Sequence, residues 1–166
     1  MKNLPKILVS SCLLGEIVRY DGKACLVSHP KLDLWIKRKQ VVSFCPEIAG
    51  GLPVPRARAA IHGKNTGVGV LNGEARIVNS DKTDVTQVYL SGARRALFVA
   101  RQYGICAAIL KENSPSCGTH YVFSPDFSSL ICGQGSTAAY LARHGINVFS
   151  ENEIDDALTF VEKSGC

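Results

Sequence analysis

The sequence predicts an α/β fold: a three-layer, Rossmann-like arrangement with a mostly parallel sheet and a small β-hairpin insertion. Short apolar runs without strict alternation occur along the chain, as expected for strands covered on both faces. Longer segments with apolar residues on one helical face separate these runs. The chain has 166 residues, and no repeat, low-complexity run or linker divides it. We therefore expect a single domain over residues 1–166.

Four short runs are expected to form the parallel sheet. Each is β-branched or apolar, and none alternates strictly between polar and apolar side chains, so each suits a strand buried on both faces. In chain order they are Ile7 to Ser10, Val41 to Phe44, Ile105 to Leu110 and Asn147 to Phe149.

Helix signals lie between these runs. Gly104 occupies the place of a C-terminal cap after the longest amphipathic segment. Pro30 suits the first turn of a helix, and Ser150 with Glu153 forms a capping box before the last apolar periodic segment. The predicted helices cover about 32–37, 84–103, 136–144 and the segment from Ile154 to Val161.

The hairpin is predicted between the second strand and the longest helix. Val68 to Leu71 and Ala75 to Val78 are short β-branched runs, and Asn72–Gly73 between them is a typical two-residue turn.

Composition favours an ordinary globular protein. Apolar residues make up 46% of the chain and charged residues 20%, with a net charge of +5. Only 7% of residues are aromatic, so a dedicated RNA-binding face is not favoured. No apolar stretch is long enough for a signal-peptide core or a membrane span. We expect a cytoplasmic protein with no membrane partner.

The cysteines carry the strongest functional signal. There are seven, an odd number, and the cytosol keeps thiols reduced, so metal binding or catalysis explains at least some of them. Cys12, Cys45 and Cys117 each follow one of the first three predicted strands. Because ligands of open parallel sheets bind outside the carboxyl ends of the strands, these thiols should converge on one crevice.

Three thiolates are one fewer than a structural zinc or a fully ligated cluster requires. On a four-iron cluster they would leave one iron open to substrate. Soft sulfur ligands favour iron–sulfur, zinc or copper(I) centres. A fourth thiol from Cys25 or Cys132 would close the coordination sphere and favour a structural role. Cys106, inside the third strand, is expected to be inert and buried, and Cys166 incidental.

Polar residues beside these cysteines are candidates for proton transfer. Glu47 lies two residues after Cys45, and Ser114 and Ser116 precede Cys117. A carboxylate and a hydroxyl at these places suit general acid–base catalysis. The alternative is that Glu47 caps backbone amides and that the serines only form turns.

The segments around these residues resemble the family DUF523. The shared segments are Ser10 to Gly15, Arg19 to Gly22, Cys45 to Glu47, Gly50 to Pro53, Pro55–Arg56, Asp84 to Thr86, Ser114 to Gly118, Gly133 to Ala138 and Gly145 to Phe149. The family includes thiouracil desulfidases, which bind a [4Fe-4S] cluster through three cysteines and remove sulfur from 2-thiouracil.

This resemblance implies a Rossmann-like enzyme whose cluster is held by Cys12, Cys45 and Cys117. It points to Glu47 with Ser114, or alternatively Ser116, as the acid–base residues. The expected reaction is hydrolytic conversion of a thiolated pyrimidine, such as 2-thiouracil, to an oxo compound and hydrogen sulfide. The cluster would be lost, or replaced by zinc, on isolation in air. Ala60 stands where the family commonly has glutamate, which could change the substrate.

A non-catalytic alternative remains. In that case the chain would be a cluster- or zinc-binding module that serves a nucleic-acid partner or metal transfer. A second pattern, Gly133 to Ala138, fits a glycine-rich dinucleotide loop. Tight packing of a helix on the sheet, or an anion site at the helix N-terminus, is the more economical explanation of that pattern.

Overall fold

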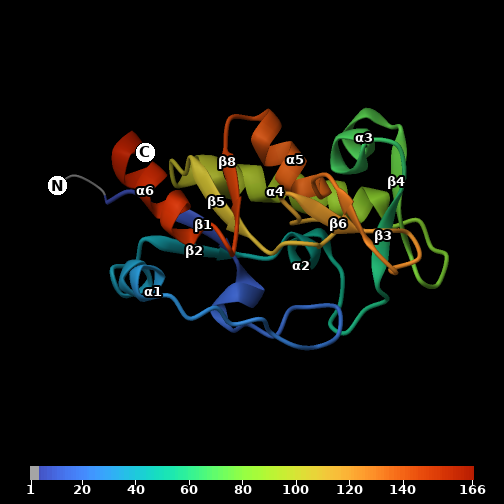
Figure 1. Ribbon diagram of the computed structural model, residues 1–166, viewed down its shortest axis with the longest axis horizontal. Helices are drawn as coiled ribbons and strands as arrows, with labels where there is room; N and C mark the ends of the chain where they lie inside the picture. The colour runs from blue at the N-terminus through green and yellow to red at the C-terminus, as the bar shows by residue number, and fades with distance from the viewer. Residues whose placement is uncertain (1–3) are drawn as a thin grey trace.

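The structure is a computed structural model that describes residues 4–166 (Figure 1). A four-stranded sheet with strand order β2-β1-β5-β8 lies at its centre, and every adjacent pair is parallel. Its strands are β1 (Ile7–Ser10), β2 (Val41–Phe44), β5 (Ala107–Leu110) and β8 (Asn147–Ser150). β1 and β5, in the middle of the sheet, are fully buried, as their apolar sequences predict.

Helices cover both faces of this sheet. Side chains of α1 (Pro30–Lys37) and α6 (Ile154–Ser164) pack with Ile7, Val9 and Ile109 on one face. Side chains of α4 (Thr86–Gln102) and α5 (Ser136–Arg143) pack with Leu8, Ala108 and Leu110 on the other. The predicted α/β class with a mostly parallel sheet between helices is therefore confirmed.

The insertion differs from the predicted hairpin. Val68 to Leu71 belongs to helix α3 (Thr66–Asn72), and Gly73 caps that helix in the left-handed conformation. Strand β4 (Ala75–Asn79) forms as expected, but it pairs antiparallel with β3 (Ala59–Gly63), which precedes α3 in the chain. A short apolar run does not by itself distinguish a strand from a buried helix, and here the helix allows a close contact. A Cβ at Gly67 would lie 2.3 Å from the carbonyl oxygen of Gly135.

A second antiparallel pair, β6 (Tyr121–Phe123) with β7 (Leu130–Cys132), lies beside β3 (Figure 1). The sequence did not predict it, because both strands have only three residues and the strand residues of β7 are all exposed.

The last helix begins later than its capping box suggests. The carboxylate of Glu153 accepts a hydrogen bond from the backbone N–H of Ser150 (2.8 Å), which is half of that motif. The hydroxyl of Ser150 accepts a hydrogen bond from the backbone N–H of Asn152 (3.2 Å), but Ser150 belongs to β8 and the helix starts only at Ile154. None of the helices in residues 4–166 has the length and apolar character needed to cross a membrane.

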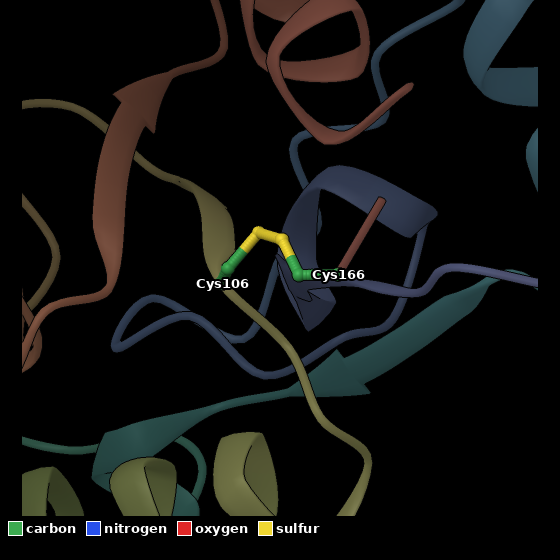
Figure 2. Close-up of a disulfide and its surroundings, with 2 residues drawn as sticks. All are labelled: Cys106 and Cys166. Carbon is green, nitrogen blue, oxygen red and sulfur yellow. A yellow bond between two sulfur atoms is a disulfide. The ribbon is translucent and has the colours of Figure 1, made fainter. Parts of the chain in front are cut away.

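Two cysteines for which the sequence analysis predicted no partner form a disulfide. Cys106, directly before β5 and only partly buried, forms a disulfide with Cys166 at the end of the chain (Figure 2). The expectation that Cys106 is an inert core thiol and Cys166 incidental was therefore wrong. The sequence around either cysteine does not indicate its partner, because 60 residues separate the two along the chain.

Candidate functional site

A cavity of about 300 Å³ opens at the carboxyl ends of β1, β2 and β5. Its walls include residues directly after each of these strands, as well as parts of α4, β3 and β6. All six residues that the sequence singled out line it: Cys12, Cys45, Glu47, Ser114, Ser116 and Cys117. The strand ends thus bring together groups that are up to 105 positions apart, from residue 12 to residue 117.

Cys12 reaches the cavity from a single 3-10 turn, η1 (Ser11–Leu14), that begins where β1 ends. Gly15 ends this turn in the left-handed conformation, with φ of 91°. Burial raises the pKa of the Cys12 thiol to about 12, and the neighbouring thiols of Cys45 and Cys25 add to the shift. The thiol is therefore neutral at pH 7 until a metal replaces its proton.

Cys45 occupies the N-cap position of the short helix α2 (Pro46–Gly50), directly after β2. Pro46 at the first helical position fixes the backbone beside the thiol. Burial raises the pKa of Cys45, while the backbone N–H groups of Ile48 and Glu47 act in the opposite direction. Helix α2 therefore presents both a thiol and a carboxylate to the cavity.

Cys117 is 5% exposed and belongs to the loop between β5 and β6. The hydroxyl oxygen of Ser114 accepts hydrogen bonds from the backbone N–H groups of Ser116 and Cys117, each at 3.2 Å. The N–H of Gly118 donates to the Ser114 carbonyl (2.9 Å), which completes a tight turn. Burial raises the pKa of Cys117, and the hydroxyl of Ser116 partly offsets this effect.

The glycine-rich segment Gly133 to Ala138 supports this turn. Backbone N–H groups at the start of α5 donate to the carbonyls of Pro115 and Ser116 at 2.8–3.1 Å. A Cβ at Gly135 would lie 2.6 Å from the Ser116 carbonyl oxygen, so only glycine allows this approach. The pattern therefore serves tight packing between a helix and the cysteine loop.

Glu112 anchors the other end of the same loop. The residue is 8% exposed, and its carboxylate accepts hydrogen bonds from the N–H groups of Thr119, His120 and Tyr121 and from the Thr119 hydroxyl, at 2.8–3.1 Å. Burial alone would raise the pKa of Glu112, but these donors outweigh it and lower the pKa. A charged carboxylate thus holds residues 119–121 in place.

Glu47 is 9% exposed, and both of its carboxylate oxygens have partners. Nε of Arg56 donates to Oε2 at 2.8 Å, and a terminal guanidinium nitrogen of Arg56 makes a second, shorter contact with the same oxygen. Oε1 accepts a hydrogen bond from the hydroxyl of Ser116 at 2.9 Å. Arg56 itself is held by the carbonyls of Val18 and Pro53.

The two serines are linked to each other. Their hydroxyl oxygens lie 2.9 Å apart. Each hydroxyl has one proton, so if Ser116 donates to Glu47, Ser114 must be the donor to Ser116. Ser116 is 1% exposed, whereas Ser114 is only partly buried. A hydrogen-bonded chain therefore runs from Ser114 through Ser116 to Glu47.

Sequence reasoning missed several polar residues of this cavity. Arg56 was noted only as part of a family segment, although a buried carboxylate such as Glu47 requires a cationic partner. Tyr89, which falls within the predicted helix over 84–103, lines the cavity, and burial together with the nearby Glu47 carboxylate raises its pKa well above the ordinary value. Lys111, paired with Glu151 at 2.6 Å, gave no signal in the sequence.

The remaining candidates divide clearly. Cys25 lines the cavity with the three predicted thiols, whereas Cys132 does not and is exposed on β7. Ala60 is buried in β3 and is absent from the cavity wall; its neighbours Arg58 and Ala59 line it instead. Within residues 4–166, no three His, Cys, Asp or Glu side chains are grouped closely enough to hold a single metal ion.

The arrangement combines soft ligands with proton-transfer groups. Thiols on three walls of one cavity are suitable ligands for iron–sulfur centres. The carboxylate and the linked hydroxyls lie beside them and can accept or donate protons. This donor set fits a cluster, with polar residues left over to act on a bound molecule.

Comparisons with known proteins agree with this arrangement. The sequence model of the 2-thiouracil desulfurase family matches residues 7–153. An uncharacterized Bacillus subtilis (strain 168) protein, YbbK, is 45% identical over 153 residues, which cover 92% of this chain and 99% of YbbK. The solved structure of a [4Fe-4S]-dependent thiouracil desulfidase, TudS, superimposes with a TM-score of 0.86 at 38% identity, covering 95% of this chain and 98% of TudS. This chain belongs to the 2-thiouracil desulfurase (DUF523) family.

Proposed function

We propose that this protein is an iron–sulfur-dependent desulfidase that replaces the sulfur of a thiolated pyrimidine, such as 2-thiouracil, with oxygen. The observation that supports this most strongly is the meeting of Cys12, Cys45 and Cys117 with Glu47 at one cavity. Family membership and the likeness to TudS point in the same direction. We take residues 1–166 as one catalytic domain.

Cys12, Cys45 and Cys117 would hold a [4Fe-4S] cluster. When bound, the cluster would supply a Lewis-acidic iron to which a thiocarbonyl sulfur is a good ligand. Burial favours the neutral form of each thiol, so cluster binding would release protons and depend on pH.

Glu47, Ser116 and Ser114 would move the protons of the reaction. In the balanced reaction, the oxygen of one water molecule replaces sulfur on the ring carbon, sulfur leaves as hydrogen sulfide, and no electrons are gained or lost. Glu47 would accept the proton of the attacking water, and Ser114 would turn its hydroxyl proton from Ser116 to the bound substrate and donate a hydrogen bond to it. The hydrogen bonds from Arg56 fix the orientation of the Glu47 carboxylate.

A non-catalytic cluster- or zinc-binding module serving nucleic acid or metal transfer is the other candidate. The presence of Cys25 at the cavity favours it, because a fourth permanent ligand would leave no iron open. Against it, a purely structural site does not require a carboxylate bonded to Arg56 and two linked hydroxyls in the same cavity.

The test is to purify and reconstitute the protein anaerobically, measure iron and sulfide, and assay 2-thiouracil for uracil and hydrogen sulfide. We expect about four irons and four sulfides per chain, with turnover. Cys12→Ala, Cys45→Ala and Cys117→Ala should each lose the cluster, while Cys132→Ala should keep it. A fully loaded protein that converts no thiolated pyrimidine would disprove the desulfidase assignment. Full iron content in all three variants would disprove the ligand assignment.

A further inference from the structure

Cys25 is placed at the cavity by backbone hydrogen bonds. It lies in the irregular segment between η1 and α1. Its backbone N–H donates to the carbonyl of Cys12 at 2.9 Å, and two residues later Val27 donates to Leu13 at 3.0 Å. These two hydrogen bonds hold the segment against the turn that carries Cys12. The position of Cys25 is therefore set by the same turn that positions Cys12.

The thiol of Cys25 shares the cavity with the three others. Cys12, Cys25, Cys45 and Cys117 all line it, and they come from four separate parts of the chain. Cys25 is close enough to Cys12 to contribute to the raised pKa of the Cys12 thiol. The remaining free cysteine among the described residues, Cys132, is on the surface of β7. The cavity is thus lined by four thiols, although three suffice for the proposed cluster site.

Cys25 differs from Cys12 and Cys117 in how firmly it is enclosed. Those two are 7% and 5% exposed, whereas Cys25 is only partly buried. Its neighbour Leu26 is 70% exposed, so the segment is close to solvent. A side chain in such a segment can be displaced without opening the core.

We propose that Cys25 is an exchangeable fourth ligand, which occupies the iron left open by Cys12, Cys45 and Cys117 until the substrate sulfur displaces it. The proposal rests on the proposed cluster function. On binding, the Cys25 thiol forms a sulfur–iron bond and releases one proton to solvent. On displacement that bond breaks and the thiolate takes up a proton again, so no oxidant or reductant is needed.

The first test is thiol protection. Anaerobically reconstituted protein is treated with iodoacetamide and analysed by peptide mass spectrometry. We expect Cys25 to be alkylated several-fold more slowly than in the cluster-free protein, with Cys132 alkylated equally fast in both as the matched control. Saturating 2-thiouracil should restore fast alkylation of Cys25. Equal rates at Cys25 with and without the cluster would overturn the proposal.

The second test separates ligation from simple shielding. A four-iron cluster with an unprotected iron loses that iron on mild oxidation and yields a three-iron form with its own EPR signal. After limited ferricyanide treatment, Cys25→Ser and Cys25→Ala should give a several-fold larger three-iron signal than the wild type or Cys132→Ser. Equal signals in fully loaded samples would overturn the proposal while leaving the three-cysteine site intact. A wild type that takes up no cluster would overturn both the proposal and the proposed function.

Discussion

The hydroxyl of Ser116 lies 2.9 Å from Oε1 of Glu47, although 69 residues separate them in the chain. One residue lies after β5 and the other after β2, so the contact exists only because the ends of these strands meet at one edge of the sheet. The pair joins the two segments that carry Cys45 and Cys117. Through Arg56 and Ser114 it becomes a network of four side chains.

Changing Glu47 to Gln tests the centre of this network. If Glu47 handles a proton in the rate-limiting step, turnover of 2-thiouracil should fall about 10²–10⁴-fold, while the visible absorption of the cluster stays unchanged. Glu74→Gln, an exposed residue outside the cavity, is the control. Wild-type turnover in Glu47→Gln would remove the acid–base role and leave the cluster site untouched.

The two serines should both matter, for different reasons. Ser114→Ala removes the partly buried hydroxyl that would contact substrate, and we expect kcat to fall about 10²–10³-fold. Ser116→Ala interrupts the chain to Glu47 and should lower kcat with little change in KM. The measurement is steady-state kinetics at equal iron content. If Ser116→Ala behaved like the wild type, Glu47 and Ser114 would have to act independently.

Glu112 predicts an acid-sensitive contribution to stability. Its pKa in the folded protein lies below the ordinary value of 4.5. The stabilisation is therefore fully present above pH 4.5 and is lost as the pH falls through the folded-state pKa. Glu112→Gln should lower the free energy of unfolding by about 1.5–3 kcal/mol at pH 7. Denaturant melts should show this difference shrinking at acidic pH; a constant difference would refute the prediction.

The Cys106–Cys166 disulfide should stabilise the fold without affecting the cluster. Under oxidising conditions, Cys166→Ala should lower the free energy of unfolding by about 2–4 kcal/mol, because the disulfide-closed loop no longer restricts the unfolded chain. In reductant the wild type and the variant should melt alike. Iron and sulfide content should be equal in both. Loss of iron in Cys166→Ala would show that the C-terminus supports the cavity, which the structure does not predict.

The sequence by itself determined the parallel sheet and the site that its strand ends were predicted to form. Apolar runs such as Ile7 to Val9 indicate burial locally, since a strand covered on both faces is apolar at nearly every position. Cys45 follows a predicted strand directly and Cys12 follows one after a single residue, so their meeting could be predicted from the strand assignment. The amphipathic pattern before Gly104 located α4 equally well.

Only the tertiary structure decided contacts between distant segments. The hydrogen bond from Arg56 to Glu47 and the position of Cys25 beside Cys12 cannot be predicted from hydrophobic periodicity. Both depend on how loops fold over the sheet. The same holds for the disulfide of Cys106, whose partner is 60 residues away. Thr66–Asn72 became a helix because its glycines pack against neighbouring backbone. In a short apolar run, packing of this kind outweighs local β preference.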